Sequence, residues 1–132
     1  MKILLLLLLS FLTFNAFSQK EMHMKNASGE TELMKLYYLV ILKPGENRLQ
    51  DTATANKLFA GHRELLSKYM KEGKLIISGP VSEIKDMFGI YIYDVADKGT
   101  AAKLVEADPA VKAGRFSYEI ISWWAPKGAI FK

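Results

Sequence analysis

Four apolar segments separated by two helical ones constrain the fold of this chain more than any other feature of its sequence. The first apolar segment, residues 36–43, is rich in aromatic and branched side chains and stops at Pro44 and Gly45. A run of this kind followed by a breaker is typical of a β-strand. Similar runs follow at residues 75–81, 89–95 and 116–125. The run at residues 89–95 alternates isoleucine and tyrosine, so we expect it to pair with the preceding strand as an antiparallel hairpin.

The first helical segment carries the period of an amphipathic helix. Leu65 and Tyr69 recur one turn apart within a stripe of apolar residues, and this stripe should face a core. Thr52 or Thr54 can cap the start of the helix. We therefore predict a helix that runs to about residue 72 and ends at a glycine.

The second helical segment is shorter and is broken by a proline. It covers residues 101–107, with Thr100 as its predicted cap. Because proline disfavours a helical backbone at the residue before it, Asp108 should leave the helix at Pro109. We expect Asp108 to cap a further turn that closes at Gly114.

The order of elements is strand, helix, strand, strand, helix, strand. Two split units of this kind make a ferredoxin-like α+β fold, βαββαβ, with a four-stranded antiparallel sheet and both helices on one face. The open face of the sheet would carry part of the tyrosine, isoleucine and tryptophan side chains. Because an apolar face of that size is a liability in a monomer, we expect a homodimer whose sheets pack together.

The first 18 residues have the pattern of an export signal. Lys2 gives a positive start, and residues 3–17 form an uncharged apolar run that is short for a membrane span. Small residues at Ala16 and Ser18 predict cleavage between Ser18 and Gln19. This would place the protein in the periplasm or outside the cell, with no stable membrane span. The alternative is an uncleaved N-terminal anchor.

Residues 19–34 are polar and show no sustained period, so we interpret them as a linker before a domain of residues 35–132. His23 stands in this linker between two methionines. These three residues alone are too few ligands to fix a metal ion. The chain has no cysteine, which excludes disulfides and thiolate sites, and we expect no metal. No glycine-rich phosphate loop or nucleophile elbow is present, so we expect no cofactor and no serine nucleophile.

The charge pattern does not favour a nucleic-acid partner. The net charge of the chain is +4, and loss of the signal lowers it by one because only Lys2 leaves. The basic residues are spread along the chain and are not interleaved with aromatic residues as on a nucleic-acid surface. We interpret them as solvated faces.

His62 lies on the apolar stripe of the first predicted helix. A histidine placed there is turned toward the sheet or a cleft beside it. A carboxylate that accepts from one ring nitrogen fixes the tautomer and leaves the other nitrogen free to take a proton, and Asp108 is the candidate for that carboxylate. The alternatives are a structural core histidine and an aspartate that only caps a helix.

The candidate substrate-binding residues are Tyr38, Ser78, Gly79 and Pro80. Gly79 would leave room for a ligand against the backbone, and Ser78 offers a hydroxyl group. The alternative for residues 78–80 is a strand that simply ends where glycine and proline stop its pairing. The alternative for Tyr38 is a place in the core or the dimer interface.

Several short stretches together resemble the YCII-related (YciI-like) domain family. They are residues 37–40, residues 61–66 around His62, residues 73–75 leading to residues 78–80, the pair Asp108 and Pro109 with Gly114, and Trp123. These stretches span about residues 35–126, in order and with ordinary spacing. The resemblance implies a dimeric ferredoxin-like α/β barrel with a site built on a histidine and an aspartate, here His62 and Asp108.

The resemblance also implies chemistry on small molecules, because a few relatives act on small cyclic compounds such as chlorinated lactones by removing a proton. We therefore predict a small cofactor-independent enzyme, a lyase or isomerase that moves a proton on a cyclic or carbonyl compound. The alternative is a non-catalytic dimeric module that binds a small ligand or serves assembly in the periplasm.

Overall fold

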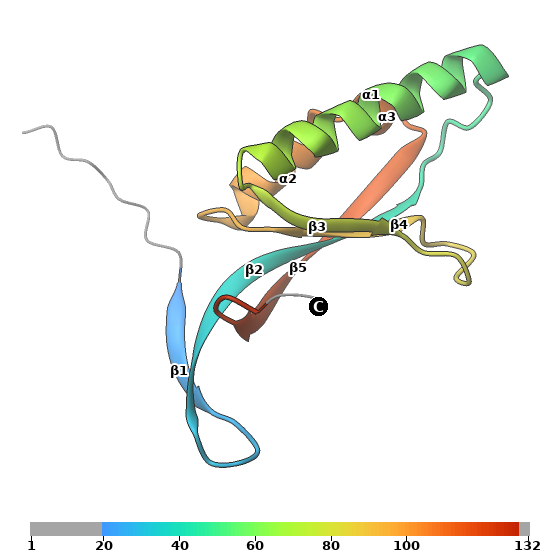
Figure 1. Ribbon diagram of the computed structural model, residues 1–132. Helices are drawn as coiled ribbons and strands as arrows, with labels where there is room; N and C mark the ends of the chain where they lie inside the picture. Colours follow the sequence, from blue (N-terminus) through green and yellow to red (C-terminus); the bar gives the residue numbers. More distant parts are fainter. Residues whose placement is uncertain (1–19, 130–132) are drawn as a thin grey trace, which may run out of the picture.

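The long strand β2 is the centre of the sheet in the computed structural model, which describes residues 20–129 (Figure 1). β5 (Phe116–Pro126) pairs antiparallel with one edge of β2 (Thr31–Pro44), and β4 (Gly89–Tyr93) pairs antiparallel with the other. β3 (Leu75–Pro80) pairs with the free edge of β4. The order β5-β2-β4-β3 is that of a ferredoxin-like sheet, so the predicted fold class is confirmed.

Within residues 20–129, three helices lie on one face of the sheet (Figure 1). They are α1 (Thr52–Lys71), α2 (Lys98–Glu106) and α3 (Pro109–Lys112). Thr54 and Thr100, two of the threonines predicted as caps, donate their backbone N–H groups instead. Asp51 accepts from Thr54 and caps α1, and Asp97 accepts from Thr100 and caps α2, each at 2.7 Å. An aspartate three residues earlier is well placed to satisfy these free N–H groups.

The segment predicted as a polar linker forms a β-hairpin instead. β1 (Glu21–Lys25) pairs antiparallel with residues 31–35 at the start of β2. The Asn26 side chain shapes the turn by accepting the backbone N–H groups of Ser28 and Glu30, both at 3.0 Å. In Figure 1 the hairpin extends away from the helices. Met22 and Met24 alternate with polar residues in β1, but every residue of the strand is exposed, and two methionines are too short an alternation to mark a strand with one buried face.

Alternate residues of β2 face opposite sides of the sheet. Because an apolar cluster lies on each side, the strand is apolar on both faces. Tyr38, Val40 and Leu42 pack in the main core beneath the helices. Tyr37 belongs to a second cluster on the open face. The large side chains left exposed on that open face are Ile76, Ile90, Ile121 and Trp123.

The helices of residues 20–129 include none with the length and apolar character needed to cross a bilayer. The predicted export signal, residues 1–18, lies outside the described residues.

Candidate active site

His62 and Asp108 are hydrogen-bonded to each other in the buried space between α1 and the sheet. Nδ1 of His62 contacts Oδ2 of Asp108. The other carboxylate oxygen, Oδ1, accepts the backbone N–H of Ala110 at 2.8 Å and so caps α3. The residues are only 8% and 4% exposed. Asp108 therefore has two functions at once, because one oxygen starts a helix and the other holds the histidine ring.

This contact sets which nitrogen of His62 carries the proton. A carboxylate can only accept, so Nδ1 of His62 is the donor to Asp108. In the neutral ring, Nε2 then keeps its lone pair. Nε2 is the group that can take a proton from a ligand.

Tyr91 of β4 completes the buried group. Its hydroxyl oxygen lies 3.3 Å from Nε2 of His62 and donates to that nitrogen. Burial, with a smaller contribution from the charge of Asp108, raises the pKa of Tyr91 to about 12. Tyr91 therefore stays protonated at neutral pH, where it can donate a hydrogen bond and cannot act as a base.

Two glycines make these contacts possible. A Cβ atom on Gly61 would lie 2.8 Å from Cγ of Pro109, so the bare backbone lets α3 approach α1 and brings Asp108 to His62. A Cβ atom on Gly89 would lie 2.8 Å from the hydroxyl of Tyr91, so the tyrosine reaches His62 across a position without a side chain. Both positions need the absence of a side chain for close approach.

The site opens into a pocket of about 460 Å³ between α1 and the sheet. Ser78, Gly79 and Pro80 of β3 line it, together with His62 and Arg63 of α1. The remaining wall is apolar or aromatic and consists of Leu42, Phe59, Leu66, Phe88, Tyr91 and Phe116. A small ring compound would fit a cavity of this size and lining.

Tyr38, the other predicted substrate contact, is not among the residues that line this pocket. It lies on the same face of β2 as Leu42, which lines the pocket, but four residues away, or about 13 Å along a strand. Tyr38 is buried in the main core. Burial and the nearby charge of Asp97 raise its pKa.

Sequence reasoning missed the contributions of Tyr91 and Arg63 to the site. Tyr91 is not among the candidate residues that the sequence indicates, and its place beside His62 depends on the register of β4 against β2. The spacing of two residues between Gly89 and Tyr91 indicates a place for Tyr91 in the site only when that strand register is already known. Arg63 directly follows His62 in the sequence, and its place in the pocket depends on how α1 crosses the sheet.

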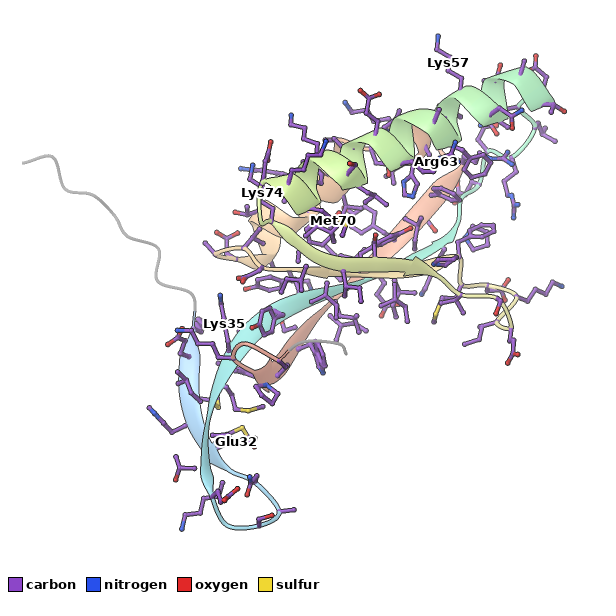
Figure 2. All side chains as sticks on the ribbon, in the orientation of Figure 1. Glu32, Lys35, Lys57, Arg63, Met70 and Lys74 are labelled. Atoms are coloured by element: carbon purple, nitrogen blue, oxygen red, sulfur yellow. The ribbon has the colours of Figure 1, made fainter. Side chains whose placement is uncertain are left out.

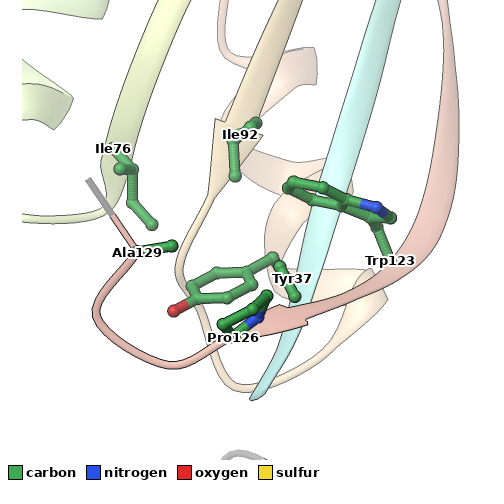
Figure 3. A pocket seen from close by; sticks show the side chains of 7 residues that line it. Tyr37, Ile76, Ile92, Trp123, Pro126 and Ala129 are labelled. Carbon is green, nitrogen blue, oxygen red and sulfur yellow. The ribbon is translucent and has the colours of Figure 1, made fainter. Parts of the chain in front are cut away.

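A second, smaller pocket of about 170 Å³ lies on the open face of the sheet and offers no proton-transfer group of this kind. Figure 3 shows Tyr37, Ile92 and Trp123 around it. Its other lining residues are Ile76, Ala125, Pro126 and Ala129. The lining is almost wholly apolar, which is typical of a contact surface.

Among residues 20–129, no three histidine, aspartate or glutamate side chains converge as a metal site would require. His62 and Asp108 are engaged with each other. Proton transfer by side chains is the chemistry that this arrangement can perform.

The sheet order and the helices on one face define a ferredoxin-like α+β domain. Residues 36–124 match the YCII-related domain family. The match covers more than half of the chain, and the protein belongs to this family.

Solved structures with the same fold include two enzymes. One is 5-chloro-2-hydroxyhydroquinone dehydrochlorinase from Burkholderia phenoliruptrix AC1100, in complex with 2,5-dihydroxybenzoquinone. It is 24% identical with a TM-score of 0.50, over 66% of this chain and 92% of the other. The second is muconolactone isomerase, which is 16% identical with a TM-score of 0.57, over 73% of this chain and 96% of the other. At these identities the similarity establishes the fold. No curated protein matches the sequence.

Proposed function

We propose that the protein is a small cofactor-independent enzyme, a lyase or isomerase that moves a proton on a small cyclic or carbonyl compound. The observation that carries this proposal is the tautomer of His62 that its hydrogen bond to Asp108 selects. Asp108 occupies Nδ1, and Nε2 is left as an acceptor beside a pocket lined by Ser78, Gly79 and Pro80.

The proposed reaction begins with a substrate C–H group next to a carbonyl. Nε2 of His62 takes the proton, and the electron pair of the C–H bond moves into an enolate. The Tyr91 hydroxyl leaves Nε2 and donates to the enolate oxygen, as an oxyanion-stabilising group does. In an isomerase, His62 then returns the proton to another carbon. In a lyase, the enolate electron pair forms the new double bond as the leaving group departs with its bonding electrons, and His62 gives its proton to that group or to water. Asp108 stabilises the imidazolium between these steps.

The two fold relatives support this choice of chemistry. One is named as a dehydrochlorinase of a hydroquinone and the other as an isomerase of a lactone. Family membership and fold raise the expectation for this reaction class. The residues that perform the reaction here are proposed from the geometry of His62, Asp108 and Tyr91.

Proton exchange with solvent tests the proposal without knowledge of the natural substrate. A panel of cyclic ketones and lactones is incubated with the protein in heavy water, and loss of the acidic C–H signal is followed by proton NMR. We expect at least one compound to exchange faster than in buffer alone. Exchange at the buffer rate for every compound would contradict the enzyme proposal and favour a ligand-binding module.

We also propose that the open face of the sheet packs against a second copy of the chain. The face carries a buried cluster around Tyr37 and Ile92, and Trp123 remains 40% exposed. An apolar face of this kind is stabilised by a matching face, and a twofold dimer supplies one.

Ile121→Asp is expected to separate this dimer. Ile121 is 38% exposed and pairs with Leu39 on the open face, so an aspartate there would be desolvated in the interface. We expect the dissociation constant to rise by about 10²-fold or more. Light scattering coupled to gel filtration measures it. Ile84→Asp is the matched control, because Ile84 is 55% exposed in the loop between β3 and β4; equal effects from both variants would contradict the proposed interface.

We propose that the chain is exported and acts in the periplasm or outside the cell, on the pattern of residues 1–18. Expression of the full chain in a Gram-negative host should yield a mature protein that begins at Gln19. Mass spectrometry of the periplasmic fraction measures this. A full-length mass, or retention in the cytoplasm, would argue against export.

A further inference from the structure

All three arginines of the chain lie around the active-site pocket. Arg63 lines it, and Figure 2 shows this residue on the side of α1 toward the sheet. The guanidinium carbon of Arg48 lies 5.0 Å from the ring centre of Phe88, and that of Arg115 lies 5.0 Å from the ring centre of Phe59. Both rings form part of the pocket wall. The positive charge of the three arginines is therefore concentrated around this pocket.

These charges are not neutralised by the protein. Within residues 20–129, the ion pairs are formed by lysines and by His62, and no arginine takes part in one. The Nη1 atom of Arg115 donates to Oε1 of Gln50 at 3.0 Å. Its Nε is buried without a hydrogen-bond partner in the same range. Arg48 and Arg63 are exposed and Arg115 is partly buried, and a bound anion would supply the ionic partner that the protein does not provide.

The pocket wall contains no aspartate, glutamate or lysine, so its charged groups are arginine and, when protonated, histidine. A guanidinium presents a planar fork of donors that matches a carboxylate. Aromatic rings flank the same space, since the ring centre of Phe116 lies 5.6 Å from that of Phe59 and 5.1 Å from that of Phe88. Planar ligands pack well against such walls.

We infer that the pocket binds a planar ring compound that carries an anionic group such as a carboxylate. The anionic group lies toward the arginines, and the ring extends toward His62. This inference rests on the proposed function, because it names the substrate class of the same site. The arginine charges would also favour the enolate that forms when His62 takes a proton.

Benzoate and its neutral analogue benzamide are suitable probes, because they share a planar ring and differ in charge. We expect NMR titration of the full chain at low ionic strength to show at least about 10-fold tighter binding of benzoate. Arg63→Gln should weaken benzoate binding by about 10-fold to 100-fold and leave benzamide binding unchanged. Added salt should weaken benzoate binding alone.

Lys57→Gln is the matched control, because it removes one positive charge from the same helix on the outer side (Figure 2). We expect this variant to bind benzoate as the wild type does. Equal affinity for the two probes, no binding of either, or equal effects of Arg63→Gln and Lys57→Gln would overturn the inference.

The outcome separates the ligand class from the catalytic proposal. If the arginine-dependent preference for benzoate holds while no compound exchanges protons, the pocket binds anions and the enzyme proposal fails. If the exchange panel is extended to ketones and lactones that carry a carboxylate and only the neutral compounds exchange protons, the enzyme proposal stands and the anionic ligand class is wrong.

Discussion

His62→Asn is expected to lower the rate of proton exchange by about 10²-fold to 10⁴-fold, the usual contribution of a general base. The asparagine amide places an N–H donor near the position of Nδ1, so Asp108 keeps a partner. No acceptor remains at the position of Nε2. Exchange rates from NMR in heavy water, measured on the compound that the wild type exchanges fastest, give the size of the loss.

The same variant separates a catalytic role from a structural one. The His62 ring packs edge-on against Phe116 and Tyr91, with ring centres 5.6 and 6.0 Å apart. Loss of these contacts should lower the free energy of unfolding by about 1–3 kcal/mol, which thermal unfolding followed by circular dichroism measures. A folded variant that exchanges protons as fast as the wild type would show that His62 is not the base.

The fold could be predicted from local sequence because each element of the main sheet has one face against a core. The break at Pro109 also places Asp108 correctly as the cap of α3. The hairpin of β1 could not be recognised in the same way. Its strand is fully exposed, and its turn depends on hydrogen bonds of the Asn26 side chain that no apolar period reveals.

The histidine–aspartate contact could be predicted in part because both residues occupy positions with a local reason. His62 lies on the inner stripe of a helix, and Asp108 precedes a proline. Their meeting depends on the close approach of two helices at Gly61, which only the packing shows. Tyr38 has no such partner, because it faces the main core but lies too far along β2 to line the pocket.

The arginines illustrate a further limit of sequence reasoning. Arg48, Arg63 and Arg115 are widely separated in the sequence and come from a loop, a helix and the residue before β5. Spread along the chain, they have the pattern of solvated surface charges. The fold places Arg48 and Arg115 over phenylalanines of the pocket that Arg63 lines, so long-range packing decides the electrostatics of the site.

Asp108→Asn is expected to reverse the tautomer of His62 and lower the exchange rate by about 10²-fold to 10⁴-fold. The asparagine oxygen would keep the hydrogen bond to the backbone N–H of Ala110, which directs the amide NH₂ toward Nδ1. Because that NH₂ group is a donor, Nδ1 must accept, and the ring proton moves to Nε2. In serine-protease triads the equivalent change costs about 10⁴-fold by the same effect.

Nitrogen-15 NMR of the imidazole ring distinguishes this mechanism from unfolding. Protonated and lone-pair nitrogens have different shifts, so the wild type should show the proton on Nδ1 and the variant on Nε2. Asp97→Asn is the matched control, because Asp97 caps α2 through Thr100 and makes no contact with His62, and asparagine is as good a cap as aspartate. The control should keep the wild-type tautomer and rate. If Asp108→Asn slowed exchange while the proton stayed on Nδ1, Asp108 would act through the charge it places near the imidazolium and not by selecting the tautomer.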